Sequence, residues 1–190
     1  MTMRITAAVA AAAGALMLPA CSDDSADENA STADVSDETL ASVVEDADGL
    51  STVSGVLGEA GLEQVFDGAA AYTLFAPQDT AFDALGEAGD DLRTAEQRAA
   101  MVAILRDHIV PGYLTPDDIA NAIEQADDGT VEMRTMGDHT LKFSGERDAI
   151  TVTAEDGASA RFAGDALRAS NGVAIPLDGV LRKVSVAPAG

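Results

Sequence analysis

The period of the hydrophobic pattern changes at Gly129, and this change constrains the fold more than any other feature. Before it, apolar residues recur at the three- and four-residue spacing of amphipathic helices, most clearly over residues 94–108. After it, apolar and polar residues alternate over residues 131–135, 141–143 and 150–152, which is typical of strands with one buried face. Helices in the first part and strands in the second predict an α+β domain.

Capping and breaking residues set the expected bounds of the elements. Ser36 or Asp37 can cap a helix that ends at Gly49. A later helix, opened by Thr115, has Pro116 at its first position. Four helices are expected over residues 36–49, 51–60, 79–85 and 94–108, and a fifth is expected after Thr115. Besides the alternating segments, strands are expected over residues 71–76, 161–163 and 173–186.

The only cysteine, Cys21, follows an export signal. Arg4 precedes an uncharged segment, residues 5–18, which at roughly 14 residues is shorter than the ~20 that a membrane-spanning helix needs. Leu-Pro-Ala-Cys at 18–21 resembles a lipobox, the cleavage and lipidation site of bacterial lipoprotein precursors. We therefore expect residues 1–20 to be a lipoprotein signal peptide and Cys21 to carry palmitate-type acyl chains that anchor the mature chain in a membrane. The alternative is a buried free cysteine.

The segment after Cys21 is acidic and polar. Residues 22–48 carry ten acidic and no basic side chains, and we expect residues 21–35 to form a solvated tether. The folded domain is then expected at residues 36–186, with a short tail at 187–190. Ser22 stands where Asp would commonly mark retention at the inner membrane, which favours an outer-membrane or surface lipoprotein facing the periplasm or the exterior.

The charge, the hydrophobic fraction and the cysteine count of the chain each exclude a class of protein. It has 33 acidic and 11 basic side chains, a formal net charge of -22, whereas nucleic-acid binding needs a patch of Lys or Arg. Hydrophobic residues still make up 47%, too many for a chain that is disordered throughout. A single cysteine excludes an intrachain disulfide framework and the usual cysteine-based zinc sites.

Three segments carry recognisable motifs in a fixed order. They are TLFAPQDTAFDAL at 73–85, LRDHIVPG at 105–112 and NGVAIPLDGVL at 171–181. Together they resemble the first signature, the central tyrosine-histidine segment and the second signature of the fasciclin (FAS1) family. The resemblance covers about residues 36–186 and implies a sandwich-like wedge of antiparallel strands with several helices packed against one end.

The motif residues are interpreted as fold determinants rather than as a chemical site. Asp79 stands at a helix start, where its carboxylate can accept hydrogen bonds from the free N–H groups of the first turn. Asn171 and Gly172 favour a tight hairpin ahead of the last strand. The full set is Phe75, Ala76, Pro77, Asp79, Phe82, Leu85, His108, Pro111, Gly112, Asn171, Gly172 and Asp178.

The sequence departs from the family pattern at two places. Asp107 occupies the position of the usual tyrosine before the central histidine, and Ile175-Pro176 replaces the histidine of the second signature. In animal members the tyrosine-histidine neighbourhood is tied to integrin adhesion, so that particular activity is not expected here. Pro176 has no N–H to donate, which predicts an edge strand or a local irregularity.

Neither histidine is expected to be catalytic. His108 lies on the apolar side of its helix, which favours a hydrogen-bonded core residue over a general base, and His139 lies in an expected surface turn. No G-x-S-x-G segment or phosphate-binding glycine loop supports a Ser-His-Asp hydrolase or a nucleotide site. No cofactor is expected. Calcium is at most a weak partner of the acidic surface, because residues 46–49 lack the later ligands of an EF-hand.

These observations predict a non-catalytic binding or adhesion module anchored in the cell envelope. Its expected partner is an envelope or matrix protein or a polysaccharide, and the sequence does not identify which. The alternative is a carrier of a small apolar ligand or lipid, held in a cleft between the helices and the sheet.

Replacing Cys21 tests the expected anchor. Cys21→Ser removes the thiol that would be acylated, so the precursor should remain uncleaved and take up no palmitate during metabolic labelling. Labelling and detergent partitioning identical to those of the wild type would contradict the lipoprotein interpretation.

Overall fold

The computed structural model describes residues 36–62, 66 and 70–184. The expected signal peptide, Cys21 and the expected tether lie outside the described residues. The helices are α1 (Leu40–Glu45), α2 (Ser51–Glu59), α4 (Asp79–Asp83), α5 (Glu87–Leu92), the 3-10 helix η1 (Ala95–Gln97), α6 (Arg98–Asp107) and α7 (Pro116–Gln125). The strands are β1 (Tyr72–Pro77), β2 (Ile109–Pro111), β3 (Thr130–Arg134), β4 (Thr140–Ser144), β5 (Thr151–Ala154), β6 (Ser159–Arg161), β7 (Leu167–Ala169) and β8 (Gly172–Leu177).

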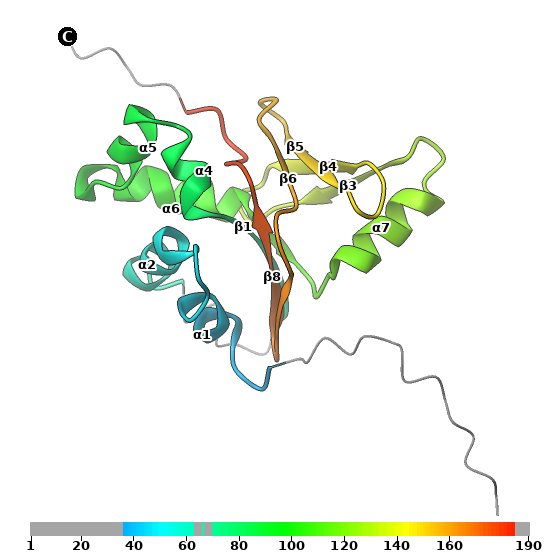
Figure 1. Ribbon diagram of the computed structural model, residues 1–190, viewed down its shortest axis with the longest axis horizontal. Coiled ribbons are helices and arrows are strands. Elements are labelled where there is room, and N and C mark those ends of the chain that lie inside the picture. Colours follow the sequence, from blue (N-terminus) through cyan, green and yellow to red (C-terminus); the bar gives the residue numbers. More distant parts are fainter. Residues whose placement is uncertain (1–35, 63–65, 67–69, 185–190) are drawn as a thin grey trace, which may run out of the picture. The chain divides into compact units, whose positions relative to one another are not determined.

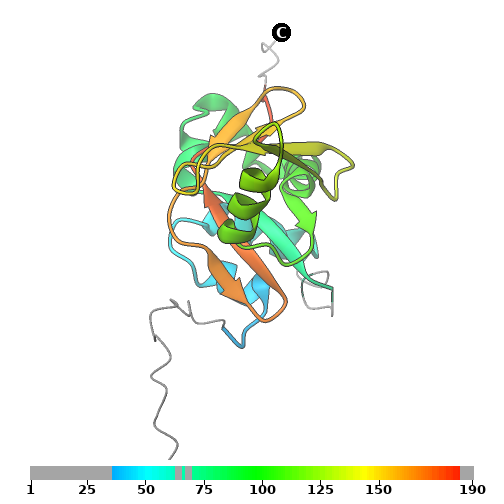
Figure 2. The same cartoon turned by 90° about the vertical axis from the view of Figure 1, so that its right-hand side faces the viewer.

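The strands form two four-stranded sheets, which confirms the α+β prediction. The first has the order β2-β1-β8-β7 and the second the order β3-β4-β5-β6. All pairs are antiparallel except β1 and β8, which run parallel over their whole length. Figure 1 shows α1, α2, α4, α5 and α6 on one side of β1 and β8, with the second sheet and α7 on the other. In Figure 2, α7 lies in front of these two strands.

Both faces of β1 and β8 are buried, so each strand contributes to two hydrophobic cores. Leu74, Ala76 and Ala174 face the core that is formed with α1, α2, α4, α5 and α6. Phe75 and Ile175 face the core that is formed with α7 and the second sheet. This division follows the two-residue period of a strand, and it explains why both strands consist almost entirely of buried residues.

The carboxylate of Asp79 caps α2 rather than its own helix. Its oxygens accept from the N–H groups of Ser51 (3.2 Å) and Thr52 (2.8 Å) and from the Ser51 hydroxyl (2.8 Å). Leu50, at the N-cap of α2, has no side chain that can do this. Burial alone would raise the pKa of Asp79, but these hydrogen bonds outweigh it and hold the pKa below its usual value. Asp79 therefore joins α4 to α2.

The first and longest expected helices differ from those observed. α1 begins after Thr39, whose hydroxyl accepts from the Ser42 N–H, so the expected cap at Ser36 or Asp37 is wrong. The helix expected over residues 94–108 is divided into η1 and α6. The short elements α5, β2 and β7 were not predicted, because three to six residues are too few to display a period.

α7 begins where the sequence predicts it. The Thr115 hydroxyl accepts from the Asp118 N–H (3.2 Å), and the Asp118 carboxylate accepts from the Thr115 N–H (2.9 Å), which forms a capping box. The hydroxyl and the N–H of Thr115 hold the pKa of Asp118 below its usual value. Pro116 occupies the first helical position as expected.

β8 lies between β1 and β7, so the edge strand expected at Pro176 is wrong, whereas the alternative expectation, a local irregularity, is confirmed. The Pro176 carbonyl accepts from the Ala163 N–H at 2.8 Å. Because the N–H and C=O of one strand residue point to the same side, the missing donor also faces the β7 side. Pairing between β7 and β8 has already ended at Ala174. The proline is accommodated because β7 does not pair with this part of β8.

The predicted hairpin is confirmed, but its glycine has a different role. Ser170 and Asn171 connect β7 to β8, and neither has a positive φ. Gly172 is the first residue of β8, where a Cβ would collide with the Tyr72 carbonyl and with the side chain of Leu40. Asn171 Oδ1 accepts from the Leu40 N–H at 2.8 Å, which ties the hairpin to the start of α1.

Two substitutions in the first motif separate core packing from capping. Phe82 is fully buried, so Phe82→Ala should lower the free energy of unfolding by about 3–5 kcal/mol. Asp79→Ala removes only the cap of α2 and should cost about 1 kcal/mol. Urea denaturation measures both. Asp83→Ala, in an exposed ion pair on the same helix, is the control and should change stability by about 0.5 kcal/mol or less. A mild Phe82→Ala variant would contradict the described core.

Candidate functional site

His108 stands at the end of α6 and joins three segments of the chain. Its Nδ1 lies 2.7 Å from the carbonyl oxygen of Ile104, and its Nε2 accepts from the Leu181 N–H at 2.9 Å. Because a carbonyl only accepts, Nδ1 must carry the ring proton. The His108 carbonyl in turn accepts from the Phe75 N–H of β1 at 2.9 Å. The imidazole is fully buried, as expected for a core histidine.

Burial keeps this imidazole neutral. It lowers the pKa of His108 from 6.5 to about 4, while the Ile104 carbonyl and the nearby Asp107 charge act in the opposite direction with smaller effect. Both ring nitrogens are already bound to the backbone. His108 therefore has no nitrogen left to bind or to deprotonate a substrate.

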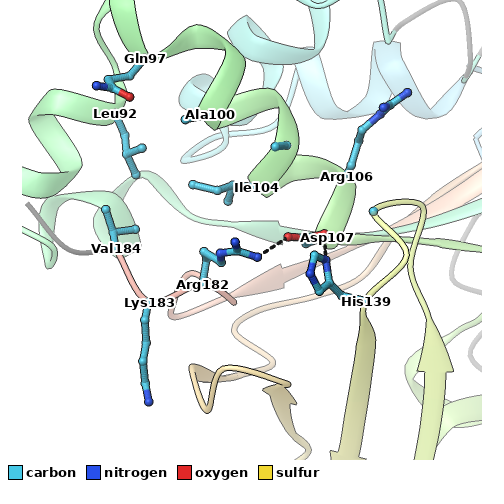
Figure 3. Close-up of a pocket in the computed structure, with 12 residues that line it drawn as sticks. Leu92, Gln97, Ala100, Ile104, Arg106, Asp107, His139, Arg182, Lys183 and Val184 are labelled. Carbon is cyan, nitrogen blue, oxygen red and sulfur yellow. Dashed lines mark hydrogen bonds and ion pairs between the residues drawn. The ribbon is translucent and has the colours of Figure 1, made fainter.

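The neighbouring side chain, Asp107, binds two residues from elsewhere in the chain. Its Oδ1 lies 2.7 Å from Nδ1 of His139, and its Oδ2 lies 3.1 Å from a terminal nitrogen of Arg182. The Asp107 side chain is only 8% exposed, whereas those of His139 and Arg182 are each 43% exposed. A nearly buried carboxylate thus holds an imidazole and a guanidinium that both reach solvent (Figure 3).

The turn between β3 and β4 brings His139 to this carboxylate. The Gly137 N–H donates to the Arg106 carbonyl (3.1 Å), and the Met136 N–H donates to the Ile109 carbonyl (2.8 Å). These two bonds hold the turn against the end of α6. A Cβ at Gly137 would collide with the Asp107 carboxylate, so this contact requires glycine.

The segment after β8 brings Arg182 to the same place. The bond from the Leu181 N–H to His108 fixes the residue before it. On the other side, Asp156 accepts from the Lys183 N–H at 2.8 Å, and its carboxylate lies 3.9 Å from Nε of Arg182. Burial alone would raise the pKa of Asp156, but its backbone hydrogen bonds and the nearby cations lower it below the usual value.

Two cavities adjoin this cluster. The first, of about 490 Å³, lies between α5, α6 and the segment after β8, and the second has about 440 Å³. Both are lined by Asp107, His139, Arg182 and Lys183. Figure 3 shows the Arg182 guanidinium directed at Asp107, with Leu92, Ile104 and Val184 on the far side of Arg182 from His139. This cluster and its cavities form the candidate site.

The motif residues predicted from the sequence lie elsewhere, and none of them lines either cavity. Asp178 accepts from the Arg161 N–H at 2.7 Å, and Gly112 has the left-handed φ of 117°. The others are buried (Phe75, Ala76, Pro77, Phe82), partly buried (Leu85), exposed at the end of β2 (Pro111), or described above (Asp79, His108, Asn171, Gly172). Apart from the exposed Pro111, these residues bind the backbone or pack in and against the cores.

Sequence reasoning missed the association of Asp107, His139 and Arg182. Asp107 was noticed only as a departure from the family pattern, and His139 was expected in a surface turn. The available signal was the acidic residue itself, because a carboxylate beside a core histidine needs cationic or hydrogen-bonding partners. Which residues supply them depends on the tertiary fold.

Neither a group of metal-binding side chains nor a membrane-spanning helix is found in the described part of the chain. No three His, Cys, Asp or Glu side chains come together there in a way that would hold a metal ion. None of the described helices combines the length and the hydrophobicity that crossing a bilayer requires. Weak calcium binding stays a prediction.

Comparison with known proteins identifies the fold. The model of the Fasciclin domain family matches residues 48–183. Among solved structures, the chain is similar to a FAS1 domain pair from the insect cell adhesion molecule Fasciclin I, with a TM-score of 0.66 and 16% sequence identity. The match covers 78% of this chain and 52% of that chain, so this chain spans about half the length of the domain pair. A search of curated proteins gave no match.

The pH dependence of stability tests the role of His108. His108→Ala should lower the free energy of unfolding at neutral pH by about 1–3 kcal/mol, because it leaves a cavity and an unpaired Leu181 N–H. In the wild type, the unfolded chain binds a proton at His108 below pH 6.5, whereas the folded chain does so only near pH 4. The contribution of His108 is therefore complete above pH 6.5 and is lost as the pH falls from 6.5 to about 4.

The difference between wild type and His108→Ala should accordingly shrink over that interval, by up to about 3 kcal/mol. Urea midpoints at neutral and mildly acidic pH measure it. A small difference that is independent of pH would show that the ring is exposed to solvent.

Proposed function

Because the chain belongs to the fasciclin family, we propose that it is a non-catalytic adhesion or binding module held at the cell envelope through Cys21. Its partner is a protein or polysaccharide of the envelope or the surrounding matrix. One observation carries this proposal: residues 48–183 match a family that has a cell adhesion molecule among its solved structures.

The hydrogen bonds of the two histidines support binding rather than catalysis. Both ring nitrogens of His108 are bound to the backbone inside the core, away from any substrate. His139 is bound to Asp107, which resembles half of a catalytic triad. Within the described residues, however, no hydroxyl is hydrogen-bonded to its ring as a nucleophile would be.

The sequence before the domain supports display away from the membrane. At ~3.3–3.6 Å per residue, the segment 21–35 can span at most about 50 Å, more than the thickness of a head-group layer. The domain itself is acidic and would be repelled by an anionic membrane surface. A partner located outside the membrane fits both features better than the membrane itself.

Attachment of intact cells tests this proposal. Cells that produce the chain should attach to surfaces coated with isolated envelope or matrix material, and excess soluble chain (residues 22–190) should compete with them. Cells that produce Cys21→Ser should lose the attachment, because the domain no longer links the cell to its ligand.

Soluble chain with Phe82→Ala, assayed at a temperature at which this variant is unfolded and the wild type is folded, is the matched control and should not compete. Equal attachment by cells with and without the protein, or competition that is insensitive to Phe82→Ala, would overturn the adhesive function.

A further inference from the structure

The cavity of about 490 Å³ has an apolar wall as well as a polar end. Leu92 of α5, Ile104 of α6 and Val184 lie together on one side of Arg182 (Figure 3). Ala100 and Ala103 extend this wall along α6. Sites for small molecules typically have volumes of about 300–1,000 Å³ and combine an apolar lining with a few fixed polar groups. This cavity has both properties.

Arg182 and His139 form the polar end. Both side chains are 43% exposed, whereas both oxygens of Asp107 are already engaged and its side chain is only 8% exposed. One terminal nitrogen of Arg182 binds Asp107, and no hydrogen bond of the other is found among the described residues. A ligand in the cavity therefore meets a guanidinium that is fixed in position and still has free N–H donors.

The charge around the cavity favours an anion. Arg106 and Lys183 also line it, with side chains that extend away from Asp107 in opposite directions (Figure 3). Asp107 is the only carboxylate among the lining residues, against three cationic side chains. Because Arg182 is paired with Asp107 and its Nε lies 3.9 Å from the Asp156 carboxylate, the net positive charge at the cavity comes from Arg106 and Lys183.

We propose that this cavity binds a free amphipathic carboxylate, such as a medium-chain fatty acid. The carboxylate binds the free N–H groups of Arg182, and the alkyl chain lies along Leu92, Ile104 and Val184. One cavity contains both the guanidinium that binds the carboxylate and the apolar wall that binds the alkyl chain. The ligand must therefore have left the membrane, because a fatty acid in a bilayer keeps its alkyl chain in the lipid. This site goes beyond the adhesive function and does not depend on it.

Calorimetric titration with three ligands of equal chain length tests the assignment. The soluble chain (residues 22–190) is used, because the acyl groups of a lipidated Cys21 would themselves compete. Decanoate should bind at a single saturable site. 1-Decanol and decylamine should each bind at least about tenfold more weakly, since neither can pair with a guanidinium.

Arg182→Gln should weaken decanoate binding at least about tenfold and leave 1-decanol binding unchanged. Arg161→Gln is the matched control, because it removes the same charge from a residue that lines neither cavity. Its affinity for decanoate should equal that of the wild type.

A second pair of variants tests the apolar wall without disturbing the ion pairs. Ala100 lines the cavity from an exposed position on α6, so Ala100→Trp should fill the space and abolish the binding of decanoate. Ala99→Trp, at the adjacent exposed position that does not line the cavity, should bind normally. This pair decides the question if Arg182→Gln does not fold.

Three results would overturn the proposal: no saturable binding of decanoate, equal affinity for decanoate and 1-decanol, or wild-type affinity in Ala100→Trp. Binding of phosphatidylglycerol vesicles that requires Arg182, without binding of decanoate, would assign the site to lipid head groups instead. Cell attachment measured with Ala100→Trp distinguishes this site from adhesion, because it should remain normal.

Discussion

A buried imidazole holds together the segments that surround the candidate site. His108 stands at the end of α6. Its backbone carbonyl accepts a hydrogen bond from the Phe75 N–H, and Nε2 of its ring accepts one from the Leu181 N–H. These bonds join the helices of the first core to β1 and to the segment after β8. They are made in the dry interior, where an unpaired donor would be costly, and the bond to the segment after β8 requires an unprotonated Nε2 on the His108 ring.

The adjacent residue extends this junction to the surface. Asp107 turns its carboxylate toward the turn that carries His139 and toward Arg182, and both partners keep one side open to solvent. Two consecutive residues thus have different roles. His108 binds backbone groups of Ile104 and Leu181, and Asp107 binds the partly exposed side chains of His139 and Arg182 beside the cavities. Asp107, the residue at which the sequence departs from the resembled family pattern, supplies both of these contacts.

Local sequence signals predicted the parts of the fold that depend on neighbouring residues. The start of α7 after Thr115, the strand at β1 and the hairpin at Asn171 all follow from patterns within a few residues. Contacts between distant segments were not predictable in this way. Asp79 was expected to cap its own helix and caps α2 instead, and Asp107 finds partners 32 and 75 residues away in sequence. Both carboxylates needed donors, but only the tertiary arrangement selects which donors are in reach.

The structural role of His108 can be measured directly by nitrogen-15 NMR of its ring in the folded chain. We expect a protonated Nδ1 and an unprotonated Nε2, with signals that stay constant from about pH 7.5 to about 5, because burial lowers the pKa of His108 to about 4. A titration with a midpoint near the ordinary value of 6.5, or a proton on Nε2, would contradict a neutral imidazole that joins α6 to the segment after β8.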